Sequence, residues 1–270
     1  MVASAEARVV HERRATGDVP LFVHEEWRER FPWALVGITG AGDDAAFDLG
    51  LFGEAPAGAV TARWRALLAR TGFPGAVHSR QAHESLVQIH EAVHEGLLVT
   101  EGFDAHATTQ SGLLLTVSVA DCVPIFLLDP PTGAVALLHA GWRGVAAGVL
   151  EAGLAALERL AGSGAERLWL HAGPAICGRC YEVGPEVHEA LGLPRPAGNE
   201  TVDLRATLVT RAVQAGLDAD RVSVSGHCTR CGPGAFFSHR GGERGRQMAV
   251  LGIRPDGHGG TNAAGTGRVD

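Results

Sequence analysis

Apolar runs separated by short polar breaks occupy the middle of the chain, a pattern typical of buried strands. Leu113–Val119 and Val123–Leu128 flank one such break, and Ala134–His139 follows a turn rich in proline and glycine. Strict alternation over residues 85–93 predicts a further strand near the surface. The remaining predicted strands are Leu168–Ala172, Val222–Ser225 and Gln247–Ile253.

Three segments place apolar residues at helical spacing instead. They are residues 59–71, 145–160 and 204–215, and the second ends at a Gly-Ser-Gly sequence that can stop a helix. Strands and helices alternate without a regular βαβ period, so we predict an α+β fold with mixed, largely antiparallel sheets. No linker interrupts the chain, so residues 1–254 are expected to form a single domain, and the apolar-poor residues 255–270 a disordered tail.

Charge and composition narrow the function classes. The net charge of -7 argues against a nucleic-acid partner. All 23 basic residues are arginines, which excludes a Schiff-base lysine and a phosphate-loop lysine. No signal-peptide core or membrane span is visible, so we predict a cytoplasmic protein without a membrane partner.

The five cysteines favour metal or thiol chemistry over a disulfide framework. Four of them form two Cys-x-x-Cys arms, at Cys177 and Cys180 and at Cys228 and Cys231. Together the arms could hold a structural zinc ion, or they could be free thiols near the active-site loops. The sequence leaves both interpretations open.

The fifth cysteine belongs to the predicted hairpin. If residues 129–132 form a four-residue loop, Cys122 pairs with His139, and a five-residue loop shifts the pairing by one position. Either pairing brings a thiolate and an imidazole to one end of the hairpin, a donor pair that suits zinc or copper. His83, just before the strand at residues 85–93, is the predicted third ligand, which would leave a fourth position open.

Several short strings resemble the YfiH-like family, also called the polyphenol oxidase or laccase-domain family and linked to peptidoglycan editing. The strings are Gln81-Ala82-His83, Ala120-Asp121-Cys122-Val123-Pro124, His139-Ala140-Gly141-Trp142-Arg143-Gly144, Gly173-Pro174-Ala175-Ile176, Tyr181-Glu182-Val183-Gly184, Cys228-Thr229, Phe236-Phe237-Ser238-His239-Arg240 and Gly245-Arg246. This resemblance spans residues 30–254. It implies a layered α/β/β/α sandwich.

The resemblance also implies an activity. Family members are described as zinc-dependent purine nucleoside phosphorylases that also deaminate adenosine and cleave methylthioadenosine, while an older description is copper-dependent phenol oxidation. The family's metal ligands correspond to His83, Cys122 and His139, and the implied partners are a purine nucleoside and phosphate. This chain departs from the family pattern at Glu84, at residues 39–41 and at Asp48.

We assign further roles as hypotheses. Asp121 would orient His139 or act as a base. Arg143 and Arg246 are candidate phosphate-binding cations, because no lysine is available. Gln81 would contact a purine edge or a ribose hydroxyl.

Three other functions remain open: a cysteine hydrolase or amidase with Cys122 as nucleophile and His139 as base, a copper-dependent polyphenol oxidase, and a non-catalytic partner in cell-envelope or division assembly. His90-Glu91-Ala92-Val93-His94 matches a metalloprotease motif, but that motif needs a helix and the alternation here predicts a strand. His11, His24, His188 and His258 are predicted to lie on the surface.

Overall fold

Two mixed sheets form the centre of the molecule in a computed structural model that describes residues 7–256. The first sheet has, in spatial order, β1 (Arg8–Val10), β15 (Val222–Ser225), β12 (Trp169–Ala172), β10 (Val123–Asp129), β11 (Ala134–Ala140), β8 (Ala105–Thr108) and β6 (Val87–His90). The second has β2 (Arg13–Arg14), β3 (Leu21–Val23), β4 (Ala34–Thr39), β16 (Gln247–Ile253), β9 (Leu113–Val119), β5 (Gly75–Arg80) and β7 (Gly96–Glu101).

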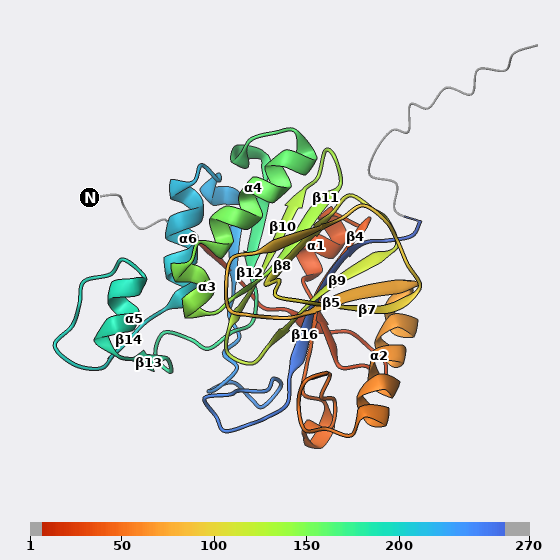
Figure 1. The fold of residues 1–270 in the computed structure, drawn as a ribbon, viewed down its shortest axis with the longest axis horizontal. Coiled ribbons are helices and arrows are strands. Elements are labelled where there is room, and N and C mark those ends of the chain that lie inside the picture. The colour runs from red at the N-terminus through yellow and green to blue at the C-terminus, as the bar shows by residue number, and fades with distance from the viewer. Residues whose placement is uncertain (1–6, 257–270) are drawn as a thin grey trace, which may run out of the picture.

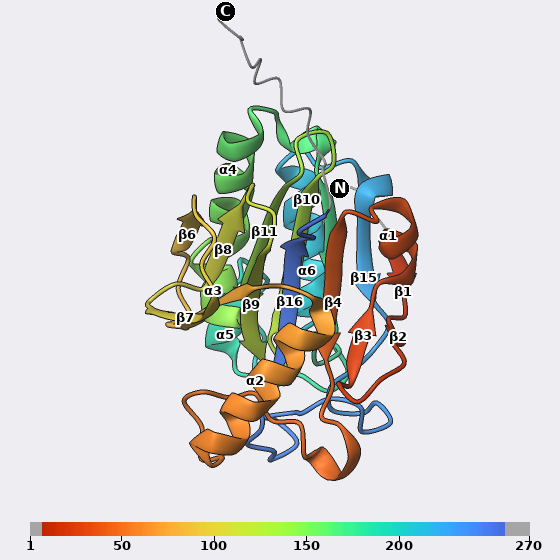
Figure 2. The ribbon, with the colours of Figure 1, turned by 90° about the vertical axis from the view of Figure 1, so that its right-hand side faces the viewer.

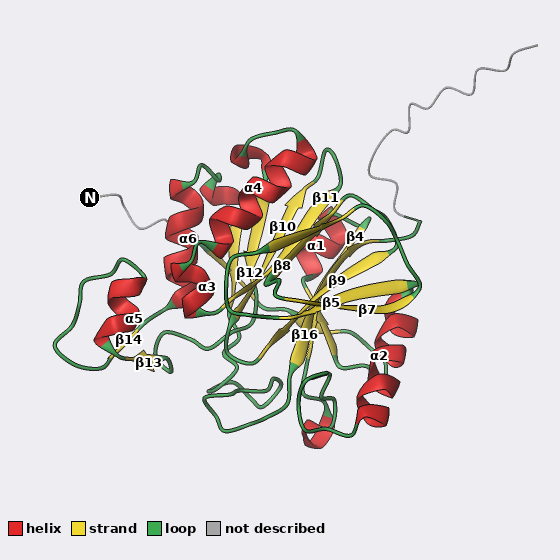
Figure 3. Ribbon diagram, viewed as in Figure 1, coloured by secondary structure: helices red, strands yellow, loops and turns green. Residues whose placement is uncertain are grey.

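Helices cover the outer faces of both sheets (Figure 1, Figure 2). The helices that pack on the first sheet are α3 (Trp142–Ala146), α4 (Val149–Ala161) and α6 (Leu204–Gln214), and the helix on the second is α2 (Ala57–Thr71). The short helix α1 (Glu25–Arg30) packs through Trp27 against the layer between the sheets. A small projection carries β13 (Glu182–Val183), α5 (Pro185–Ala190) and β14 (Glu200–Thr201) (Figure 3).

Three apolar layers hold this arrangement together. Phe126 and Leu137 of the first sheet meet Val117 and Leu251 of the second in the central layer. The outer layers lie between the first sheet and α4 and α6, and between the second sheet and α2. Alternate residues of β10 and β11 therefore face opposite apolar layers, which explains why these strands are apolar throughout.

The predicted fold class is confirmed: the molecule is an α+β sandwich of helix, sheet, sheet and helix layers. The strands from residue 113 onward agree with the prediction closely. The predicted helix over 145–160 is two helices, because Gly148 adopts a left-handed φ of 86° between α3 and α4. The predicted strand over 85–93 is shorter, since β6 ends at His90.

The predicted tail lies almost entirely outside the described residues, and so does His258. His11 is exposed as predicted, but His24 and His188 are buried, so that part of the surface prediction is wrong. None of the helices within residues 7–256 is both long and apolar enough to cross a bilayer.

The pairing directions bring many strand ends to one edge of the sandwich. β5, β9, β11, β12 and β15 end there, and β10 and β16 begin there. At this edge the chain passes from β9 in one sheet to β10 in the other through Ala120, Asp121 and Cys122. Asp121 makes this tight crossing with a φ of 87°, a value rare for a residue other than glycine.

Candidate metal centre and its cavities

The predicted ligands Cys122 and His139 come together at this edge, but through a different register from the predicted one. Pro124, not Cys122, pairs with His139, because the hairpin loop is residues 130–133. The register is shifted by two residues, and a shift of two leaves every side chain on the same face of a strand. Cys122 therefore remains a diagonal neighbour of His139, and the predicted proximity is confirmed.

His83 joins this pair from the loop after β5. The donor atoms of His83, Cys122 and His139 all lie within 4.8 Å of one another. His139 is buried, Cys122 is half-buried and His83 is exposed, so the group sits at the mouth of a cavity. The two imidazole rings meet edge to face with their centroids 4.8 Å apart.

Asp104 positions both His139 and the loop of His83, and the sequence did not predict this role. Its fully buried carboxylate accepts a 2.8 Å hydrogen bond from Nδ1 of His139. The same carboxylate accepts hydrogen bonds of 2.9–3.0 Å from the backbone N–H groups of Ala82, His83 and Glu84. Asp104 thus fixes both the ring of His139 and the loop that carries His83. The Phe-Asp-Ala string around it offered no local signal.

The hydrogen bond to Asp104 also sets the chemistry of His139. Because Nδ1 is engaged with the carboxylate, Nε2 is the nitrogen left to face Cys122 and His83. His83 itself adopts a φ of 61°, and the three N–H bonds to Asp104 hold its loop in this strained conformation.

The thiol and the buried imidazole form a coupled pair. Burial alone raises the pKa of Cys122, but the charge of His139 and hydrogen bonds from His139 and His83 outweigh burial and lower that pKa to about 6. Burial lowers the pKa of His139, but the Cys122 thiolate and the Asp104 hydrogen bond outweigh it and raise that pKa to about 9. Each shift favours the charged form of its group, the thiolate of Cys122 and the imidazolium of His139.

Asp121 lies beside these residues but bonds elsewhere. Its carboxylate accepts hydrogen bonds from the hydroxyl groups of Thr229 and Ser238, at 2.6 and 2.7 Å, and from the backbone N–H of Arg240 at 2.6 Å. The predicted contact that orients His139 is therefore made by Asp104 instead. Asp121 connects the β9–β10 crossing to two C-terminal loops.

Two neighbouring cavities border the predicted ligands, of which His83 and Cys122 line both and His139 lines only one. One has a volume of about 310 Å³ and is lined by Trp142, Arg143, Tyr181 and Arg240. The other has a volume of about 420 Å³ and is lined by Phe52, Arg80, Gln81, His139 and Arg246. Both cavities share His83, Ala120, Cys122 and His239 as a common wall.

The predicted substrate-contacting residues divide between the cavities. Arg143 lies in the smaller one, where its guanidinium stacks 4.3 Å from the ring centre of Trp142. Arg246 lies in the larger one, and Asp48 accepts a 2.9 Å hydrogen bond from its backbone N–H. Gln81 lines the larger cavity, but its amide group bonds both the backbone and the hydroxyl of Ser118, so a substrate contact would compete with those bonds.

The donor set fits a metal ion. Two imidazole nitrogens and one thiolate, with one imidazole fixed by a carboxylate, are the ligands and the outer hydrogen bond typical of zinc in enzymes. His83, Cys122 and His139 would hold the ion and leave one coordination position facing the cavities. The metalloprotease motif does not form a site, because His90 ends strand β6 and His94 follows in a loop.

The second predicted cluster also assembles. Cys177, Cys180, Cys228 and Cys231 place their sulfur atoms within 4.8 Å of one another, and this group can bind a metal. It lies beside the smaller cavity, since Tyr181 directly follows the first arm.

Sequence comparison finds a family and named relatives. The family described as multi-copper polyphenol oxidoreductase laccase matches residues 39–254. A protein from an unknown prokaryotic organism named adenosine deaminase RL5 is 37% identical over 61% of this chain and 69% of its own length. A purine nucleoside phosphorylase of Xylella fastidiosa is 34% identical over 75% of this chain and 81% of its own length.

Comparison with solved structures finds proteins of the same fold. The crystal structure of YlmD from Geobacillus stearothermophilus matches with a TM-score of 0.80 and 27% identity, covering 91% of this chain and 99% of that one. The Bacillus licheniformis protein YfiH matches with a TM-score of 0.78 at 24% identity, a likeness of fold. The layered sandwich predicted from the sequence strings is therefore shared with solved structures.

Proposed function

Because the chain belongs to the multi-copper polyphenol oxidoreductase laccase family, with relatives named purine nucleoside phosphorylase and adenosine deaminase, we propose that it is a zinc-dependent purine nucleoside phosphorylase. We extend the proposal to adenosine deamination and to methylthioadenosine cleavage. The observation that carries it is the common wall of His83 and Cys122, which separates two cavities that each hold two arginines.

Phosphorolysis needs such a two-sided site. A phosphate oxygen bonds to C1′ of the ribose while the bond from C1′ to the purine nitrogen breaks, and the purine leaves with the bonding electron pair and takes up a proton. The anion and the nucleoside must therefore approach one carbon from different directions. Two cavities that meet at one wall provide this geometry.

We assign the nucleoside to the smaller cavity and phosphate to the larger. Trp142 and Tyr181 offer aromatic faces of the kind on which bases stack. Arg80 and Arg246 offer permanent positive charge for a dianion. Deamination would instead use water as co-substrate: the water oxygen bonds to C6 of the adenine, and the exocyclic nitrogen takes up a proton and leaves as ammonia.

The chain's own residues prepare this site. Asp104 holds His139 and the His83 loop, and Asp121 holds Thr229 and the loop of Arg240, which lines the nucleoside cavity. We propose that Asp121 acts by this positioning. A zinc ion on the three ligands would supply a Lewis acid that polarises a substrate oxygen.

Purine release from inosine by purified, zinc-loaded protein tests the proposal. We expect hypoxanthine to form only when phosphate is present. Arg246→Gln should raise KM for phosphate about tenfold or more with little change in KM for inosine, because it removes a charge-assisted contact. Trp142→Leu should raise KM for inosine instead. Turnover that does not depend on phosphate would contradict phosphorolysis, and equal effects of the two variants on both substrates would contradict the cavity assignment.

One observation favours a second candidate, a cysteine hydrolase. The sulfur of Cys122 and a ring nitrogen of His139 lie within 4.8 Å of each other, as a cysteine nucleophile and its base do, and His139 lowers the pKa of Cys122 to about 6. Amide-hydrolysing activity that increases on metal removal and is lost on alkylation of Cys122 would support the hydrolase. The same result would count against the phosphorylase.

A further inference from the structure

The two Cys-x-x-Cys arms carry an inference that does not depend on the proposed function. We propose that Cys177, Cys180, Cys228 and Cys231 bind a structural zinc ion that clamps together two loops, one of which leads into the wall of the smaller cavity at Tyr181 while the other is bonded to that wall at Asp121. This ion would be separate from the one at His83, Cys122 and His139, so the folded protein would hold two.

The topology explains why distant arms meet. β12 and β15 are neighbouring parallel strands, so both chains leave them at the same edge of the sheet. Their pairing resumes beyond the strands, where Ala175 bridges Cys228 and accepts a 3.1 Å hydrogen bond from the N–H of Thr229. Each arm therefore starts beside the other, although Cys177 and Cys228 are far apart in the sequence.

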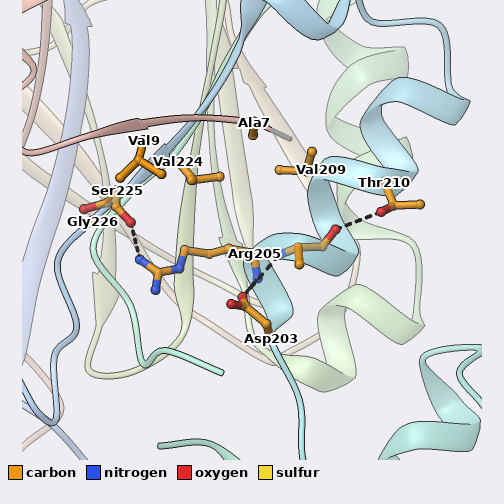
Figure 4. Close-up of a pocket in the computed structure, with 10 residues that line it drawn as sticks. Ala7, Val9, Asp203, Arg205, Val209, Thr210, Val224, Ser225 and Gly226 are labelled. Carbon is orange, nitrogen blue, oxygen red and sulfur yellow. Dashed lines mark hydrogen bonds between the residues drawn. The ribbon is translucent and has the colours of Figure 1, made fainter. Parts of the chain in front are cut away.

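Arg205 anchors the second arm from the helix side. It extends from α6 and is itself buried, and its guanidinium donates a 2.5 Å hydrogen bond to the carbonyl of Ser225 (Figure 4). A second hydrogen bond, of 2.9 Å, reaches the carbonyl of His227, the residue before Cys228. Asp203, which caps α6, packs against Gly178 of the first arm, where a side chain would leave no room. The scaffold thus fixes both arms before any ion binds.

The sulfur geometry matches zinc better than a disulfide. The sulfurs of Cys177 and Cys231 lie 3.8 Å apart. Four thiolates at about 2.3 Å from a tetrahedral zinc ion are separated by about 3.8 Å, whereas a disulfide requires about 2.05 Å.

The surroundings of the cluster suit bound thiolates. The backbone N–H groups of Cys177 and Cys231 both donate to the sulfur of Cys228, at 3.3 and 3.4 Å, as outer hydrogen bonds to a metal-bound thiolate do. Each arm also carries an exposed arginine, Arg179 or Arg230, which offsets the double negative charge of zinc with four thiolates.

The clamp reaches the smaller cavity by two short connections. Tyr181 directly follows Cys180 and lines the cavity, while Thr229 directly follows Cys228 and donates its hydroxyl to Asp121. Arg230 adds a 2.9 Å hydrogen bond to the carbonyl of Cys180, which joins one arm to the other. An ion on the four sulfurs would therefore fix Tyr181 of the cavity wall directly and Asp121 of the same wall through Thr229.

Zinc content after dialysis against a mild chelator tests this proposal on the full-length protein. We expect about two zinc ions per chain in the wild type and about one in both Cys122→Ala and Cys231→Ser. Cobalt substituted into Cys122→Ala should give the intense visible absorption of a tetrahedral thiolate complex. Two results would overturn the four-cysteine site. One is the loss of all zinc from Cys122→Ala. The other is about one zinc ion per chain in the wild type and the same content in Cys231→Ser.

A second readout addresses the clamp. Trypsin can cut after Arg179 and Arg230, which lie exposed inside the arms. We expect zinc-loaded Cys122→Ala to resist cleavage at both positions and Cys231→Ser to be cut at least tenfold faster. Equal cleavage rates would overturn the clamp, and the zinc content of Cys122→Ala decides the site even if Cys231→Ser folds poorly.

Discussion

At the scale of single residues, the proposed metal centre would depend on a carboxylate that does not itself bind the metal. Asp104 holds one candidate ligand, His139, through its ring nitrogen and another, His83, through its backbone. Several N–H donors and His139 keep the pKa of Asp104 below its usual range despite burial, so it stays ionised. Its charge favours a fixed, strongly donating His139.

Replacing Asp104 with Asn should weaken zinc binding by about 10- to 100-fold, because it removes the charge behind His139 and one acceptor for the His83 loop. Competition with a calibrated zinc chelator measures this affinity. Asp129→Asn is the matched control, since Asp129 is equally buried at the far end of strand β10. An equal loss of affinity in both variants would mean that the effect is general destabilisation.

The sequence predicted that three candidate ligands lie close together, but not what positions them. His83, Cys122 and His139 have side chains whose chemistry narrows their roles, and two of them flank a readable hairpin. Asp104 lies in a loop whose importance comes only from tertiary contacts with residues 82–84. The same reason explains why the bonds of Asp121 to Thr229 and Ser238 were not predicted.

At the scale of elements, helix α3 begins beside the candidate ligands His83 and Cys122. Gly141 caps this helix with an ordinary φ of -78°, so its backbone does not require glycine. Space does: a Cβ there would lie 2.9 Å from the sulfur of Cys122 and 3.2 Å from the ring of His83. The start of the helix therefore packs directly on two of the ligands.

Gly141→Ala should accordingly lower zinc affinity at least tenfold while costing about 1 kcal/mol or less through the helix cap. Chelator competition and urea unfolding separate the two effects. Gly58→Ala in α2 is the control, because a Cβ there meets no neighbour within 4 Å. Unchanged zinc affinity in Gly141→Ala would show that the ligands can move aside.

Elements with strong apolar patterns were predictable, and their ends were less so. Strands β9 and β16 agree with the prediction residue for residue. The hairpin register shifted by two residues because the loop includes Gly133 at a φ of 75°, a choice of turn that composition alone does not decide. The break at Gly148 was hidden for a related reason, since one glycine rarely stops a helical pattern.

At the scale of the whole molecule, the sandwich buries histidines in an uncharged form. Burial lowers the pKa of His24 to about 3 and the pKa values of His78 and His90 to about 4, and it lowers the pKa of His106 well below its usual range. Below pH 6.5 these histidines bind protons in the unfolded chain but stay neutral in the folded protein. The free energy of unfolding therefore decreases as the pH decreases. His139, whose pKa is raised, acts in the opposite direction.

We expect the free energy of unfolding to decrease between pH 7 and pH 5, with His24 alone accounting for about 2 kcal/mol. Its neutral Nδ1 accepts the N–H of Trp27 and caps helix α1, a role that protonation abolishes. His24→Asn keeps a capping acceptor without the titration, so urea unfolding should show a smaller decrease. His11→Asn, at an exposed site, controls for removing an imidazole, and an identical pH dependence in wild type and His24→Asn would contradict this account.

The overall architecture followed from the mixture of apolar strands and amphipathic helices together with the family strings. The hydrophobic pattern of the sequence could not show which strand belongs to which sheet, because each apolar run could form a strand of either sheet. That assignment depends on the switch from β9 to β10 through Asp121, a crossing visible only in three dimensions. It brings candidate ligands from both halves of the sandwich to one edge.

The shared wall between the two cavities also bears on inhibitor design. Small fragments that bind weakly on either side of Cys122 would lie close enough to be joined by a short tether past His239. Joining them makes the second contact intramolecular, and the linked compound can bind about 10² to 10⁴ times more tightly than either fragment. A protein with a single pocket would not bind both halves of such a compound. The division into two cavities would therefore make the linked compound selective for this protein.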